Sequence, residues 1–263
     1  MNSAPVQMNG EMQNRLMTEL KLDGTRLSMD AMLEFGWHYQ AFNQHFDAAE
    51  KNAVRTILSQ TVAASAERHA MITVAGRVQP AGADSVIVDL ISNDGSFSTA
   101  SLGSAALEQF SRSDAASMLL DKLVLQPATN VDGRARLITA LAILNPKAIP
   151  GESDSRQRFI DVVRTELRSG NDELVLQEAL LAARDLRLKG NEAGDELKQL
   201  IEDYRAGNAS ETVAKRAIVA LAATREAGAR SYLTSLKREF GGRFSQHIDL
   251  SILTPFTVLV DSK

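Results

Sequence analysis

Two histidines and the single tryptophan near the N-terminus form the first candidate site. His38 and His45 are seven residues apart, close to Asp47 and within an aromatic-rich segment around Trp37. A helical zinc site usually places two histidines four residues apart and needs a third ligand, and this spacing does not match. We therefore predict no bound metal and no cofactor, and interpret the segment as packed aromatic core. A ligand pocket around Trp37 and His38 is the alternative that stays open.

Arginines in the C-terminal half form a second candidate site. These are Arg184, Arg187, Arg225 and Arg230. Guanidinium groups that recur along a surface bind carboxylates, so one interpretation is a recognition strip for an acidic peptide or protein. In the other interpretation the arginines lie on a solvated face and exchange ion pairs with nearby glutamates. Those glutamates are Glu178, Glu192 and Glu226.

Catalytic motifs are missing from the sequence. It contains no Gly-x-Ser-x-Gly elbow, no Ser-x-x-Lys pair and no His-Glu-x-x-His helix, and it has no cysteine. The glycines at Gly95 and Gly103 lack the Gly-Lys-Ser/Thr ending of a phosphate-binding loop. The acidic pairs 195–196 and 202–203 are expected near helix ends and in solvent, where their pKa values would not suit acid–base catalysis. We therefore predict that the protein is not an enzyme.

The charge distribution argues against nucleic acid as a partner. The net charge is −4; before Arg134 there are 9 basic and 15 acidic residues, and from Arg134 onward 20 basic and 18 acidic. Proteins that bind phosphate backbones generally carry a clear basic excess on one module. We therefore expect the partner to be another protein.

Hydropathy and the start of the chain set expectations for localisation. No apolar stretch reaches the roughly 20 residues of a membrane span, and the first residues lack the pattern of a secretory signal. As written, the chain is predicted to be soluble and cytoplasmic. If a leader has been removed, a periplasmic or secreted location is the alternative.

The chain divides by composition into five segments. We predict a disordered start at 1–9, an N-terminal helical region at 10–83, helical hairpins with weak repeats at 84–145, a repeat region at 152–245 and a C-terminal cap or tail at 246–263. The prolines and glycine between 146 and 151 make the clearest break.

Three local predictions concern the first half. A capping box formed by Asp47 and Glu50 opens a helix that we expect to run to about Ala75. The β-branched run 85–91 is ambiguous, and we favour helix because no partner strand lies nearby. Residues 92–104 are predicted to be a polar Gly/Ser connection.

An internal repeat is the strongest pattern in the sequence. Five residues recur at an offset of 38: Glu173, Val175, Ala179, Arg187 and Gly190 match Glu211, Val213, Ala217, Arg225 and Gly228. Three apolar positions recur at offsets of 37 and then 36, namely Ile160/Leu197/Leu233, Val163/Leu200/Leu236 and Leu167/Tyr204/Phe240. Their i, i+3, i+7 spacing indicates one buried stripe on each helix. A helix pair that cannot bury its apolar face alone must stack on the next pair.

The run Asn208–Ala222, followed by Gly228–Leu236, resembles the short HEAT-type repeat, in which a polar cap precedes Val-x-x-x-Ala-x-x-Ala-Leu and a second helix follows. The resemblance covers about 132–240. It implies an all-α fold in which antiparallel helix pairs stack into an α-solenoid, and it implies no activity.

Architecture and composition together favour a non-enzymatic module that binds or scaffolds another protein. One alternative is a nucleic-acid-binding or DNA-repair-type enzyme of the HEAT-like kind, with a pocket at Trp37. Another alternative is a structural protein of the cell envelope.

Overall fold

The computed structural model describes residues 47–144, 153–168 and 170–240 of the chain. Within these ranges the secondary structure comprises eleven α-helices and a short π-helical segment, without strands, so the all-α prediction is confirmed. The helices divide into two compact units between Pro146 and Lys147, at the break marked by prolines in the sequence. Helix packing within the units is consistent with a helical stack.

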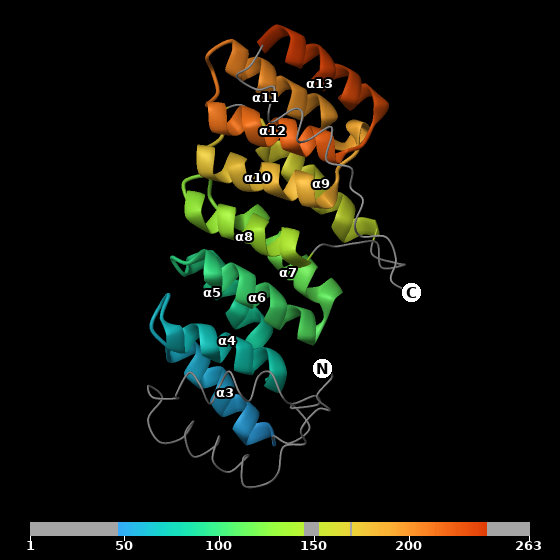
Figure 1. Ribbon diagram of the computed structural model, residues 1–263. Helices are drawn as coiled ribbons and strands as arrows, with labels where there is room; N and C mark the ends of the chain where they lie inside the picture. Colours follow the sequence, from blue (N-terminus) through green and yellow to red (C-terminus); the bar gives the residue numbers. More distant parts are fainter. Residues whose placement is uncertain (1–46, 145–152, 169, 241–263) are drawn as a thin grey trace, which may run out of the picture. The chain divides into compact units, whose positions relative to one another are not determined.

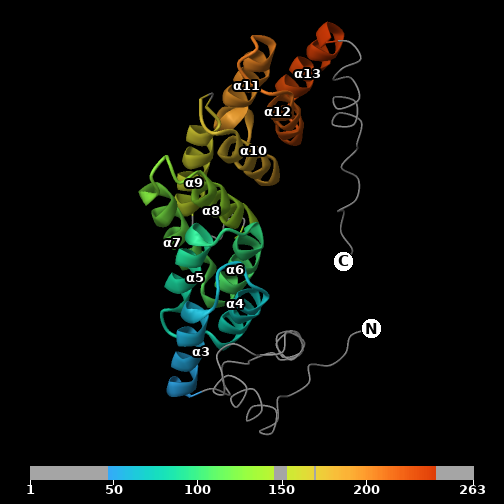
Figure 2. The same cartoon turned by 90° about the vertical axis from the view of Figure 1, so that its left-hand side faces the viewer.

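Unit 1 contains three helix pairs in two layers. The helices are α3 (Ala48–Gln60), α4 (Ala66–Val78), α5 (Ala83–Asn93), α6 (Phe97–Phe110), α7 (Arg112–Leu125) and α8 (Val131–Leu144). The second helices of the pairs pack on one another, α4 on α6 and α6 on α8, and the first helices lie along the other side (Figures 1 and 2). The β-branched run 85–91 lies in α5, which confirms the helix that we favoured.

The predicted connection at 92–104 is wrong, because most of it belongs to α6. The loop is only three residues long, and Ser96 begins the helix by accepting a hydrogen bond from the Ser98 amide. Thr99 and Ser104 are fully buried. The Ser104 hydroxyl lies 2.9 Å from the Ala140 carbonyl oxygen of α8. Small polar residues therefore serve here as contact residues that let two helices approach closely, and their composition was misread as a loop.

The helix that opens near Asp47 is also shorter than predicted. It ends at Gln60, and a new helix, α4, begins at Ala66. Ser65 is the N-cap and accepts a hydrogen bond from the Arg68 amide, while Ala64 has a φ of 52°. The turn has neither glycine nor proline, so its one sequence signal is the serine before an acidic first turn.

Buried arginines join the helix ends of unit 1. Arg68 donates to the carbonyl oxygen and the hydroxyl of Thr61 just after α3, and its guanidinium lies 3.5 Å from the fully buried Asp94 carboxylate. In the same way, Arg136 of α8 donates to the Ile91 and Ser92 carbonyl oxygens, each at 2.9 Å. Burial lowers the pKa of Arg136, although nearby carboxylates partly oppose the shift. Each arginine thus satisfies carbonyls that a helix end leaves open.

Unit 2 contains α9 (Ser153–Glu166), α10 (Glu173–Leu186), α11 (Asp195–Arg205), α12 (Glu211–Ala223) and α13 (Ala227–Phe240). A π-helical turn at Gly190–Gly194 leads into α11. Helix α10 packs on α9 and α12, and α12 also packs on α11 and α13 (Figure 1).

Most residues matched by the sequence offsets have closely similar environments in unit 2. Glu173 and Glu211 are the first residues of α10 and α12, after the N-caps Asp172 and Ser210. The matched pairs Val175/Val213 and Ala179/Ala217, together with the trios that begin at Ile160 and Val163, are all at most 2% exposed. In the third trio Leu167 is buried and Tyr204 half-buried, while the Phe240 side chain lies outside the described part.

Polar links hold successive pairs of unit 2 in register. Arg156 and Arg164 of α9 pair with Glu192 and Glu196 at 3.1 and 2.9 Å. Burial alone would raise the pKa of Glu192, but the Lys189 amide and the Arg156 guanidinium hold that pKa below its usual value. These contacts are specific to one alignment of the helices and therefore help to fix it.

A hydrogen bond to a carboxylate also links α13 to α11. The Tyr232 hydroxyl donates to the Glu202 carboxylate at 2.7 Å. Burial and this hydrogen bond raise the pKa of the Tyr232 phenol well above its ordinary value, so the phenol stays protonated and keeps donating over a wide pH range.

Two glycines matched by the repeat provide a paired test of packing. The Gly190 amide donates to the Glu226 carboxylate at 2.8 Å, and a Cβ at Gly190 would overlap that carboxylate, whereas a Cβ at Gly228 meets nothing within 4 Å. We expect Gly190→Ala to lower the free energy of unfolding by about 1 kcal/mol, because it displaces a hydrogen-bonded charged group. Gly228→Ala lies in α13 and should be neutral or stabilise by up to about 1 kcal/mol.

Urea denaturation followed by circular dichroism measures both glycine variants. Equal losses of stability in the two would contradict the assigned role of Gly190.

Several sequence predictions lie outside the described residues. They are the disordered start at 1–9, the first part of the N-terminal helical region (10–46), the aromatic cluster with Trp37 and His38, the side-chain half of the capping box at Glu50, and the cap or tail at 246–263.

Candidate functional site

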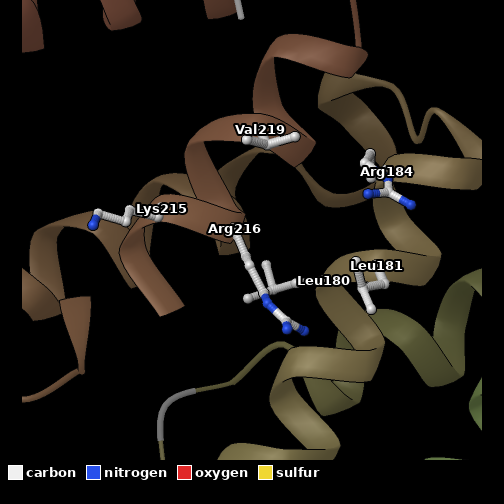
Figure 3. Close-up of a pocket in the computed structure, with 6 residues that line it drawn as sticks. All are labelled: Leu180, Leu181, Arg184, Lys215, Arg216 and Val219. Atoms are coloured by element: carbon white, nitrogen blue, oxygen red, sulfur yellow. The ribbon is translucent and has the colours of Figure 1, made fainter. Parts of the chain in front are cut away.

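A surface groove lies between α10 and α12 of unit 2. Its lining residues are Leu180, Leu181, Arg184, Lys215, Arg216 and Val219, and its volume is about 240 Å³ (Figure 3). Each helix contributes residues at i, i+1 and i+4, which places them on one side of the helix. The groove therefore combines an aliphatic surface with three cationic side chains and has no acidic residue among its lining residues.

The aliphatic surface of the groove is partly open to solvent. Val219 is 37% exposed, Leu181 is half-buried and Leu180 is buried. The opposite sides of the two helices carry buried alanines, including Ala179, which is fully buried. Those small residues allow close packing. Leu180 also belongs to the buried core, whereas Leu181 and Val219 stay partly open to solvent on the groove side.

The cations of the groove are only weakly engaged. Arg184 pairs with its neighbour Asp185 at 2.7 Å, and Lys215 pairs with Glu211 one turn earlier at 2.8 Å. All four of these side chains are at least 36% exposed, and exposed pairs of this kind contribute about 0–1 kcal/mol. A ligand carboxylate can replace such partners at little cost.

Arg216 extends from α12 toward α10. Figure 3 shows its guanidinium beside Leu180, and Nη1 lies 3.4 Å from the Gln177 carbonyl oxygen of α10. That long contact is the one hydrogen bond of the side chain within the described ranges, and no carboxylate of those ranges forms an ion pair with it. Arg216 is therefore the cation of the groove with the most hydrogen-bonding capacity to offer a ligand.

Of the four predicted arginines, the structure brings only Arg184 into the groove. Arg187 and Arg225 are exposed and have positive φ angles of 50° and 60° at the turns that follow α10 and α12. Arg230 is exposed in the first turn of α13. The recurrence of Arg187 and Arg225 thus coincides with two equivalent turns, where the backbone amide of Arg187 also caps α10.

Three of the groups in the predicted ion-pair exchange have other partners. Arg184 pairs with Asp185, Glu192 pairs with Arg156, and Glu226 accepts a hydrogen bond from the Gly190 amide. Lys215 and Arg216 were missed as site residues. Projecting 211–223 as a helix would have found them, since Val219 falls one turn after Lys215 and Arg216 on a helix whose other side is alanine-rich.

The acidic pairs do not all face solvent as predicted. Asp203 is 8% exposed, and its Oδ1 accepts a hydrogen bond from Gln199 at 2.9 Å. The backbone carbonyl of Asp203 also receives the Asn208 amide where the chain turns after α11. Asp203 therefore supports the end of a helix.

The described ranges contain no group of three or more histidine or carboxylate side chains arranged to hold a metal ion. None of the helices in them has both the length and the apolar character needed to cross a membrane.

Comparison with known proteins gives no relative for this chain: no family model matches it, and neither does any curated protein or solved structure.

Proposed function

We propose that this chain is a non-enzymatic interaction module, built as a HEAT-like stack of helix pairs, that binds another protein through the groove between α10 and α12. The observation that carries the proposal is the exposed Val219 beside three weakly engaged cations. Interaction sites commonly combine an apolar centre with arginine at its edge.

The packing of unit 2 supports this role for the groove. Both helices that form it are anchored by buried residues on their other faces, such as Val175 and Val213, so the groove side is presented on a rigid support. A pre-formed surface reduces the entropy that binding must overcome.

Charge and polarity reversal in the groove tests the proposal. We expect Val219→Asp and Arg216→Glu each to abolish capture of the partner from a lysate of the native organism, with little change in the melting temperature. Val219→Asp removes the apolar contact, and Arg216→Glu turns attraction into repulsion. Capture is measured by affinity purification and quantitative mass spectrometry.

Two variants elsewhere serve as matched controls. Lys198→Glu makes the same charge change on α11, and Leu125→Asp places an acid at a side chain that is 79% exposed in unit 1. Both should retain the partner. If all four variants capture the same proteins in the same amounts, the groove is not the binding site.

A further inference from the structure

We infer that the groove recognises an acidic linear segment of the partner, in which one apolar residue is flanked on both sides by Asp or Glu. This inference rests on the proposed function and specifies the chemistry of the partner.

The volume of the groove indicates a side chain as its occupant. At about 240 Å³ it is smaller than the roughly 300–1,000 Å³ of pockets that enclose small-molecule ligands. Leu181 and Val219 offer an aliphatic contact that is open on one side. An aliphatic or aromatic residue that projects from a peptide fits such a site as an anchor.

The cations are placed to select the residues beside that anchor. Arg184 comes from α10, whereas Lys215 and Arg216 come from α12, so positive charge is available from both helices (Figure 3). The present partners of Arg184 and Lys215 are exposed carboxylates, and the Arg216 guanidinium reaches only a carbonyl oxygen 3.4 Å away. Carboxylates that approach from a peptide would form stronger, charge-assisted hydrogen bonds there.

A single-stranded nucleic acid fits the groove less well. Proteins that bind such strands without sequence preference stack bases on aromatic side chains, and the six lining residues include none. The C-terminal half also carries nearly balanced charge, with 20 basic and 18 acidic residues from Arg134 onward. Charge and contact surface together favour a peptide.

Selection from a random dodecapeptide display library tests the inference on the full chain. Peptides retained equally by the Val219→Asp variant are discarded, so those that remain depend on the groove. We expect them to share an apolar residue between acidic ones. A chosen peptide is then synthesised, and its dissociation constant is measured by fluorescence anisotropy.

Replacing the acidic residues of that peptide by their amides should weaken binding about tenfold or more, because charged hydrogen bonds are lost. Raising the salt concentration should weaken binding of the acidic peptide. Binding of the amide version should stay nearly unchanged. In addition, Arg216→Glu should weaken binding of the acidic peptide, because one of the three cations becomes a negative charge.

The outcomes separate the inference from the function on which it rests. Groove-dependent peptides that are neutral or basic would overturn the acidic specificity and leave the binding module intact. If no peptide depends on Val219, both fail. A single-stranded oligothymidine that binds more tightly than the selected peptide, and loses affinity on Arg216→Glu, would overturn the inference in favour of nucleic acid.

Discussion

Replacing Arg68 by Met is expected to lower the free energy of unfolding of unit 1 by about 3–5 kcal/mol, the usual cost of removing one member of a buried ion pair. The guanidinium is the hydrogen-bonding partner of Asp94, whose side chain is fully buried and whose Oδ1 already has no hydrogen bond. Without Arg68 the carboxylate would keep its desolvation penalty and lose this compensation, and the carbonyl of Thr61 would lose a donor.

Variants of Asp94 and of a second arginine, Arg77, provide comparisons for this test. Asp94→Ala should cost less, since Arg68 keeps the hydroxyl and carbonyl oxygens of Thr61 as acceptors. The double variant should be less destabilised than the sum of the single changes. Arg77→Met, also on α4 but half-buried and at its last turn, should stay within about 0.5 kcal/mol of the parent.

Urea denaturation gives the stabilities in this series, and hydrogen exchange assigns the loss to unit 1. Both are needed because a chain with two compact units need not unfold in one step. A loss for Arg68→Met no larger than that for Arg77→Met would contradict the role of the buried pair.

Phe159→Ala should have a comparable effect on unit 2, with an expected loss of about 3–5 kcal/mol. Phe159 is 0% exposed and is among the largest fully buried side chains of the described residues. Truncation removes its buried apolar surface and leaves a cavity that the helices around it can close only in part.

Phe97→Ala is the matched control for this truncation. Phe97 is 37% exposed at the start of α6, so the same chemical change should cost no more than about 1 kcal/mol. Hydrogen exchange should show weakened protection in α9 to α12 for Phe159→Ala and unchanged protection in α4 to α8. Equal costs for the two phenylalanines would contradict the assignment of Phe159 to the core.

The buried positions of unit 2 were largely predictable from the sequence. Ile160, Leu197 and Leu233 repeat at near-constant offsets, and each is at most 1% exposed. The spacing of the apolar residues predicts which positions are buried, because each helix presents one apolar stripe to its neighbours.

Features that depend on contacts between distant residues were missed. The serines of α6 look like loop residues until α8 is placed against them, as the contact of Ser104 with Ala140 illustrates. Asp203 was expected in solvent because its local sequence is polar, yet it lies inside the turn after α11. Neither outcome follows from local propensity alone.

The sequence predicted the cationic character of the candidate site but only one of the arginines that line it, Arg184. Recurrence at a fixed offset in the sequence points to Arg187 and Arg225, which lie in turns and not in the groove. The groove depends on which residues share one side of two neighbouring helices, so it includes Arg184 and adds Arg216 and Val219. Recognition of a partner stays a prediction for all of them.

The hydrogen bonds from Arg136 to the end of α5 have a consequence for folding during synthesis. Helix α5 is complete in sequence at Asn93, but the donor for its last carbonyls comes 45 residues after Ile91. While a nascent chain leaves the ribosome, these carbonyls must stay hydrated until α8 has emerged. During synthesis from the N-terminus, the end of α5 can therefore reach its final hydrogen bonding only after α8 has been made.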